Sequence, residues 1–124
     1  MLTAAAIVFV VDAAAGPAPL DASVAAQLRL HGRPVVLAAN KCDEERMDER
    51  AGEFARFGFP VVPVSAMHNR GIEQLIEGII GHVPATDGAA PASAGEALRI
   101  AIVGRPNVGK SSFINRILHA DRVI

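Results

Sequence analysis

Apolar residues along the chain form short continuous runs separated by more polar segments. Three runs, residues 5–12, 33–40 and 59–66, are rich in valine and alanine, and a fourth covers residues 98–104. Runs of this length and type are typical of strands that are buried on both faces of a sheet. We therefore predict four strands, and two prolines in the third run place that strand at a sheet edge or end it early.

The segments between the first three strands carry apolar residues at helical spacing. Asp21 is placed to cap a first helix, which would carry Val24 and Leu28 on its buried face. A second helix is expected to carry Met47, Ala51 and Phe54 at helical spacing and to end at Gly58.

Helical spacing is clearest in residues 72–80, where apolar side chains share one face and acidic and amide side chains lie opposite. A fourth helix is expected over Lys110–Leu118. Its inward-facing residues would be Phe113, Ile114, Ile117 and Leu118. Strands that alternate with helices predict an α/β fold with a parallel sheet, in which ligands bind at the carboxyl ends of the strands.

Composition and charge narrow the class of protein. The chain has 124 residues, of which 51% are apolar, so it can bury a core, and its net charge of −1 gives no reason to expect DNA or a membrane as partner. The single cysteine, Cys42, excludes an internal disulfide and favours a reducing compartment, the cytoplasm. The apolar run at Ala4–Val11 follows no basic residue and is too short to span a bilayer, so we interpret it as a buried strand.

Residues 104–111, GRPNVGKS, match the phosphate-loop pattern in its required context, between an apolar strand and a helix. Backbone N–H groups and the helix N-terminus of such a loop attract phosphates. Lys110 would contact the β- and γ-phosphates, and the Ser111 hydroxyl would bind Mg²⁺. The predicted phosphate-binding residues are Gly104, Arg105, Pro106, Asn107, Val108, Gly109, Lys110, Ser111 and Ser112.

The sequence Asn40-Lys41-Cys42-Asp43 follows the second strand and is typical of a guanine-binding motif. The Asp43 carboxylate can accept hydrogen bonds from N1–H and the N2 amine of guanine, whereas adenine offers an acceptor at N1. Leaving a buried acceptor unpaired costs about 1–3 kcal/mol, which favours guanine. Asn40 would reach the other edge of the purine and the Lys41 stem would cover its ring. Cys42 is expected to be a small buried side chain, because no activating group is evident.

The loop that follows the third strand is expected to complete the base site. Ser65 would stabilise this loop, and the Ala66 N–H would approach O6 of guanine, with Met67 beside it. We interpret His68 as an exposed turn residue. Asp12 does not belong to a D-x-x-G motif, because the spacing to the next glycine is one residue too long.

Four segments resemble the Der (EngA) family of bacterial GTPases, which carry two GTP-binding domains in tandem. They are residues 9–21, 38–43, 63–79 and 98–118, and they occur in the order found in that family. The resemblance implies an incomplete phosphate-loop GTPase fold of three α/β/α layers, with GTP or GDP and Mg²⁺ as ligands. It also implies that the intact protein hydrolyses GTP and assists assembly of the large ribosomal subunit, with rRNA as a partner. Asn107 matches the residue that related potassium-stimulated GTPases use to hold K⁺.

This resemblance also explains why the guanine motif precedes the phosphate loop. Residues 1–84 would be the C-terminal half of a first GTP-binding domain, residues 85–97 a linker, and residues 98–124 the start of a second domain. We predict that Leu98–Val103 lies beside Ala6–Val11 in one sheet, in a permuted arrangement. A chain without switch motifs should hydrolyse GTP negligibly by itself.

Other interpretations remain open at this point. A circularly permuted ribosome-assembly GTPase would have the same order of motifs. The chain could instead be a nucleotide-binding module without activity, or an ATP-utilising phosphate-loop enzyme.

Overall fold

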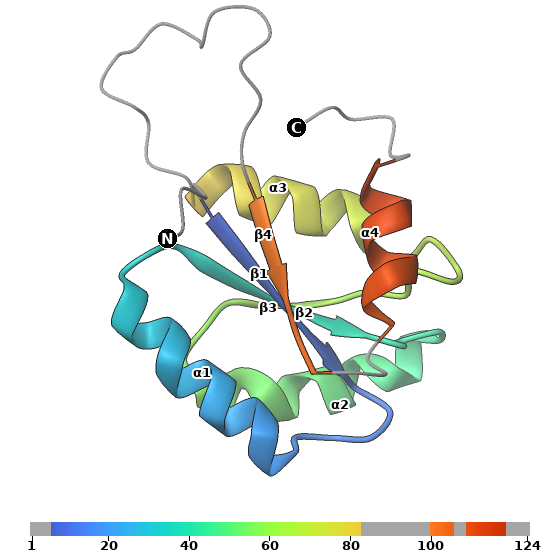
Figure 1. The fold of residues 1–124 in the computed structure, drawn as a ribbon. Coiled ribbons are helices and arrows are strands. Elements are labelled where there is room, and N and C mark those ends of the chain that lie inside the picture. The colour runs from blue at the N-terminus through green and yellow to red at the C-terminus, as the bar shows by residue number, and fades with distance from the viewer. Residues whose placement is uncertain (1–5, 83–99, 106–108, 119–124) are drawn as a thin grey trace, which may run out of the picture.

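The computed structural model describes residues 6–82, 100–105 and 109–118 (Figure 1). The elements are the strands β1 (Ala6–Asp12), β2 (Val35–Asn40), β3 (Val61–Pro63) and β4 (Ile100–Val103), the α-helices α1 (Pro19–His31), α2 (Asp48–Ala51), α3 (Ile72–His82) and α4 (Lys110–Leu118), and the 3₁₀ helices η1 (Glu45–Met47) and η2 (Gly52–Phe57).

The four strands form one parallel sheet in the order β3-β2-β1-β4. β3 is at an edge, as its prolines indicated. β4 pairs with β1 from Ala6 opposite Ile100 to Phe9 opposite Val103. The prediction that the late strand lies beside the first one is therefore confirmed for residues 100–103, while residues 98 and 99 lie outside the described residues.

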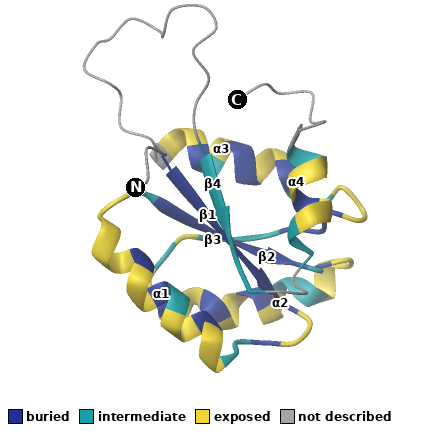
Figure 2. Ribbon diagram, viewed as in Figure 1, coloured by how far each residue is buried: buried dark blue, intermediate teal, exposed yellow. Residues whose placement is uncertain are grey.

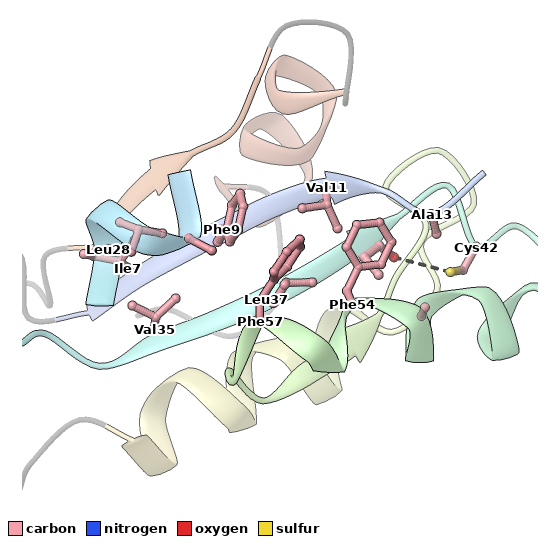
Figure 3. Close-up of a cluster of buried hydrophobic side chains, with 13 residues drawn as sticks. Ile7, Phe9, Val11, Ala13, Leu28, Val35, Leu37, Cys42, Phe54 and Phe57 are labelled. Carbon is pink, nitrogen blue, oxygen red and sulfur yellow. Dashed lines mark hydrogen bonds between the residues drawn. The ribbon is translucent and has the colours of Figure 1, made fainter. Parts of the chain in front are cut away.

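Alternating side chains of β1 enter two separate cores, which makes the fold three-layered. Val8 and Val10 pack with α3 and with Phe113 of α4. Phe9 and Val11 pack with α1, α2 and η2 on the opposite face, in the cluster drawn in Figure 3. Figure 1 shows α3 and α4 on one face of the sheet, and α1 and α2 on the other. The expected α/β/α architecture is confirmed.

The strands differ in burial (Figure 2). All seven residues of β1 and all six of β2 are buried, whereas all four of β4 are only partly buried. This follows from the topology, because β1 and β2 have a strand on each side and a layer of helices on each face, while β4 is an edge strand.

Three expectations about the helices need correction. Ala18, rather than Asp21, is the N-cap of α1; Asp21 lies in the first turn and its Oδ2 accepts a hydrogen bond from the Ala18 N–H at 2.9 Å. The second helix is split into η1, α2 and η2, although it ends as expected at Gly58 in left-handed conformation. Ile114 is 38% exposed rather than inward-facing, whereas Phe113 is fully buried.

Some predictions fall on parts of the chain that are not described. They include the linker at residues 85–97, Pro106, Asn107 and Val108 of the phosphate loop, and the side chain of Leu118. Among the residues that are described, no helix combines the length and apolar character needed to cross a membrane.

Candidate guanine nucleotide site

Both sequence motifs lie at the carboxyl edge of the sheet. β1 and β2 end side by side, with Asp12 opposite Asn40 in the register. The loop after β3 and the loop after β4 begin at the same edge because all strands are parallel. Residues that are far apart in the sequence therefore converge where open α/β sheets bind their ligands.

Asn40, the last residue of β2, lies between the phosphate loop and the loop at residues 64–71 that follows β3, here called the base loop. Its side chain is buried, and its Oδ1 accepts a hydrogen bond from the Ala66 N–H at 3.1 Å. On the other side lies Gly109, which has a φ of +87° and lies so close that an added Cβ would be 2.6 Å from Asn40 Nδ2. Glycine is required here both by the backbone conformation and by the lack of space. The two halves of the predicted site thus meet at one amide.

Asp43 is held by the loop that follows β3. The Ser65 hydroxyl donates to Asp43 Oδ1 at 2.7 Å and accepts a hydrogen bond from the His68 N–H at 3.1 Å. Ser65 is fully buried, while the Asp43 side chain is 47% exposed. The Ser65 hydroxyl therefore fixes Oδ1 of Asp43 from the protein interior, while the Asp43 carboxylate stays accessible to a ligand at the surface.

His68 and Met67 lie in the outer part of the same loop. His68 is exposed, as predicted, and its Nε2 lies 3.9 Å from Asp43 Oδ2. Met67 is 76% exposed. The structure thus brings the predicted base-contacting residues of this loop next to Asn40 and Asp43.

Lys41 has an unusual backbone conformation. Its φ is +74°, in the left-handed region that few residues other than glycine adopt. Its ammonium group lies 3.0 Å from Asp12 Oδ2 at the end of β1. The lysine side chain therefore extends along the carboxyl edge of the sheet, toward β1.

Cys42 is a structural residue. It is fully buried, and its thiol donates to the Ala39 carbonyl at 3.4 Å (Figure 3). Burial raises the pKa of the Cys42 thiol, and the nearby Asp48 carboxylate raises it further. Arg70 donates to the Cys42 carbonyl and so links this motif to the end of the base loop. A protonated, buried thiol is a poor nucleophile, in line with the sequence interpretation.

The phosphate loop leads directly from β4 into α4. α4 begins at Lys110 directly after Gly109, and the Gly109 carbonyl accepts the first helical hydrogen bond from the Phe113 N–H at 2.9 Å. The Lys110 ammonium folds back and donates to the Gly104 carbonyl at 3.0 Å. Ser111 and Ser112 are exposed in the first turn of α4.

Two arginines connect the phosphate-loop segment to the rest of the molecule, and sequence analysis missed the role of both. Arg105 lies 3.2 Å from Asp21, whose side chain is fully buried in the first turn of α1. Arg116 of α4 donates to the Ala66 carbonyl at 3.0 Å. No local pattern signals these contacts, because the partners are 84 and 50 residues apart in the chain.

The residues present suit Mg²⁺ better than a transition metal. No group of three or more His, Cys, Asp or Glu side chains is arranged to hold a metal within residues 6–82, 100–105 and 109–118. Mg²⁺ needs few protein ligands when it binds together with phosphates, and it prefers hard oxygen donors. The Ser111 hydroxyl, one residue after Lys110, is a donor of that kind.

Two different protein families match the N-terminal and the C-terminal parts of the chain. Residues 1–85 match the family model described as the elongation factor Tu GTP binding domain. Residues 99–124 match the model described as a 50S ribosome-binding GTPase.

Curated relatives and solved structures agree with these matches. The chain is 46% identical over 125 residues to GTPase Der of Myxococcus xanthus, covering 95% of this chain and 27% of the relative. It is 42% identical over 119 residues to GTPase Der of Geotalea daltonii, covering 95% and 26%. The chain thus spans about a quarter of the length of the curated relatives it matches.

Among solved structures, YjeQ from Thermotoga maritima matches with a TM-score of 0.66 at 19% identity, covering 98% of this chain and 40% of YjeQ. This likeness concerns the fold alone. Together with the motifs and their convergence on one sheet edge, the matches confirm the resemblance stated from the sequence. The chain belongs to the GTP binding domain family described by the elongation factor Tu model, and over almost its whole length it is similar to a segment of GTPase Der.

Proposed function

We propose that the chain binds guanine nucleotide in one composite site, with the base held by the loops after β2 and β3 and the phosphates by the loop after β4. The close approach of Gly109 to Asn40 carries this proposal, since it joins the phosphate loop to the base motif. In this arrangement the order of the motifs along the chain does not matter, because β4 reaches the sheet beside β1.

The base would be recognised through Asp43. Ser65 uses one lone pair of Oδ1, so the carboxylate retains enough acceptor capacity for N1–H and the N2 amine of guanine. The Ala66 N–H, which donates to Asn40 Oδ1, would be shared with O6 of the purine. The Lys41 stem would lie over the ring, and Met67 would border it.

The phosphates would be held by the N-terminal end of α4 and by Lys110. Lys110 would exchange the Gly104 carbonyl for the β- and γ-phosphates, a stronger, charge-assisted contact. The Ser111 hydroxyl would bind Mg²⁺, which neutralises phosphate charge when it is bound. Asn107 would contribute to a K⁺ site, so hydrolysis by the intact protein should fall when Na⁺ replaces K⁺; equal rates in the two salts would contradict this role.

The composite site is proposed for the present chain. In a longer protein, we propose instead that residues 1–84 and 98–124 belong to successive GTP-binding domains joined by a linker at residues 85–97. That protein would hydrolyse GTP in the cytoplasm and assist assembly of the large ribosomal subunit, in contact with rRNA. The name of the family model over residues 99–124, a 50S ribosome-binding GTPase, and the relatives named GTPase Der support this proposal. The present chain alone should release phosphate from GTP negligibly, because its sequence contains no D-x-x-G motif that would contact the γ-phosphate and Mg²⁺.

The pairing of β4 with β1 also favours a second candidate, a circularly permuted GTPase of the same functional class. The two candidates differ in the gene beyond Ile124. A tandem GTPase should contain a D-x-x-G motif followed by a second N-K-x-D motif there, whereas a permuted GTPase should contain no second N-K-x-D.

Binding of a fluorescent GDP analogue to this chain tests the composite site. Unlabelled GDP should displace the analogue and ADP should not. Asp43→Ala should weaken binding by about ten- to a few hundred-fold, the equivalent of one unpaired buried group. Glu44→Ala is the matched control, since the Glu44 side chain is exposed next to Asp43 and pairs with Arg46 at the surface. Equal displacement by ADP, or unchanged affinity in Asp43→Ala, would overturn the proposal.

A further inference from the structure

Asp12 is a buried carboxylate that neither the sequence motifs nor the proposed function uses. It ends β1 and lies opposite Asn40 in the register, so it belongs to the same sheet edge as the base motif. Its side chain is only 12% exposed. A carboxylate is rarely buried to this degree unless it forms hydrogen bonds or an ion pair.

Both oxygens of Asp12 are engaged, and they serve different parts of the molecule. Oδ1 accepts a hydrogen bond from the Ala15 N–H at 3.1 Å, and Oδ2 accepts one from the Lys41 ammonium at 3.0 Å. The first bond closes the turn after β1, which the hydrogen bond from the Gly16 N–H to the Asp12 carbonyl at 3.1 Å also supports. The carboxylate is thus fixed in orientation before it meets Lys41.

Lys41 is the partner that gains from this contact. Its side chain is 41% exposed, and a long, half-exposed lysine ordinarily samples many rotamers that it loses when it is fixed. The left-handed backbone of Lys41 sets the direction in which the side chain leaves the chain, and Asp12 sets where its end lies. The positions of the Lys41 Cα and of its ammonium group are then both fixed, and this restricts the rotamers of the methylene stem between them.

We propose that Asp12 is a positioning residue for nucleotide binding: it holds Lys41 in place so that the lysine stem is already ordered as one wall of the base site. This inference rests on the proposed function. Asp12 would not touch the nucleotide itself. Asp12 would reduce the side-chain entropy that Lys41 loses when the nucleotide binds. Removal of the Asp12 charge should weaken binding mainly because the nucleotide dissociates faster.

Long-range electrostatics predicts the opposite result, which makes the inference easy to test. A nucleotide is an anion, so removal of a negative charge near its site should strengthen binding if charge were all that mattered. Positioning predicts weaker binding. Asp12→Asn is the informative substitution, because its side-chain oxygen can still accept the hydrogen bond from Ala15 while the ion pair is lost.

The experiment is a double-mutant cycle with fluorescent GDP on the whole chain. Asp12→Asn and Lys41→Met, which keeps an unbranched stem, should each weaken GDP binding by about two- to fivefold, a range typical of a half-exposed charge pair. The double variant should bind as each single variant does, because either change alone already breaks the ion pair between Asp12 and Lys41. Glu44→Gln removes a nearby exposed charge and should leave binding unchanged or slightly stronger.

Thermal unfolding separates positioning from a structural role. Asp12→Asn should leave the melting temperature nearly unchanged while it speeds GDP release. If Asp12→Asn binds GDP as tightly as the parent chain, or if its effect persists undiminished in the Lys41→Met background, the inference is wrong although the proposed function stands. If the parent chain prefers no guanine nucleotide over ADP, the proposed function fails and the inference fails with it.

Discussion

The two segments that form the candidate site are held in the fold by different means. Residues 6–82 carry three strands and most of both cores, and every residue of β1 and β2 is buried. In residues 100–118, all four residues of β4 are partly buried, and Phe113 is the one fully buried large side chain among those described. Residues 6–82, called the base-binding segment after their proposed role, are therefore stabilised mainly by apolar burial. Residues 100–118, called the phosphate-binding segment in the same way, combine one large buried side chain with a few specific contacts.

This difference has a consequence for assembly of the site. Apolar burial stabilises a core but has little directionality, whereas hydrogen bonds and ion pairs require defined geometry. Arg105, Arg116 and Gly109 each contact a different part of the base-binding segment. These contacts determine where the phosphate loop lies relative to Asn40, while Phe113 supplies much of the attraction.

The largest expected effects come from truncating one large side chain in each segment. Phe54 and Phe113 are both fully buried, so Phe54→Ala and Phe113→Ala should each cost about 3–5 kcal/mol. For Phe54→Ala the whole chain should lose stability in urea. For Phe113→Ala we expect amide hydrogen exchange to accelerate in β4 and α4 while the amides of β1 and β2 stay protected. Equal acceleration in all strands would show that the two segments are one cooperative unit.

A smaller effect is expected where the phosphate loop meets the base motif. Gly109→Ala places a Cβ 2.6 Å from Asn40 Nδ2 at a φ of +87°, so the loop or the amide must shift. We expect GDP affinity to fall at least tenfold, with a loss of stability of about 1 kcal/mol from backbone strain. Gly81→Ala in α3 is the matched control, because nothing lies within 4 Å of the added Cβ. Unchanged GDP binding by Gly109→Ala would show that the phosphate loop does not contribute to the nucleotide site beside Asn40.

The ion pair between the segments should contribute less to stability than either of the two buried phenylalanines. Arg105→Met leaves the fully buried Asp21 carboxylate without its cation, and we expect a cost of about 1–3 kcal/mol in urea unfolding. Asp21→Asn in the same chain should recover part of this loss, since no buried charge then remains. If Arg105→Met is neutral, the pair does not help to dock the phosphate loop.

The smallest effect concerns Cys42, which lies in the base-binding segment alone. Its pKa is raised by burial, so the folded chain holds the thiol proton more tightly than the unfolded chain, where the pKa is about 8.5. Stability from this group is complete below that pH and is lost as the pH rises through the folded-state pKa. Between pH 7 and pH 10 the parent chain should lose slightly more stability than Cys42→Ala, by about 1 kcal/mol or less. Identical pH profiles would contradict a raised pKa.

The elements of the fold were predictable where the pattern was local. The continuous apolar runs predicted β1, β2 and β4, the prolines predicted the edge position of β3, and the spacing of apolar residues predicted α3 and α4. The second helix was predicted as one piece because Met47, Ala51 and Phe54 fit helical spacing; the structure divides it into 3₁₀ and α turns that bury the same side chains. The capping role of Asp21 was recognised, but at the wrong position, because a carboxylate at the third position of the helix can accept a hydrogen bond from the N–H of the N-cap residue.

The site was predictable only as two lists of residues. The chemistry of phosphate and guanine recognition is carried by short motifs, so the sequence predicts roles for Lys110 and Asp43, and these roles stay predictions. The contacts of Asn40 with Gly109, of Asp12 with Lys41 and of Arg105 with Asp21 could not, because each joins residues from separate motifs. Nothing in a local pattern states which loop will face which.

The amino-acid sequence by itself determined the kind of layers in this protein, and it predicted which residues would handle phosphate and base, since both depend on the chemistry of neighbouring residues along the chain. The tertiary structure alone decided that the two motifs share one sheet edge, with Gly109 against Asn40 and Asp12 holding Lys41. Strand order and side-chain contacts between distant segments arise only when the whole sheet packs between its two layers of helices. Such non-local packing cannot be recognised from the pattern of any single stretch of sequence.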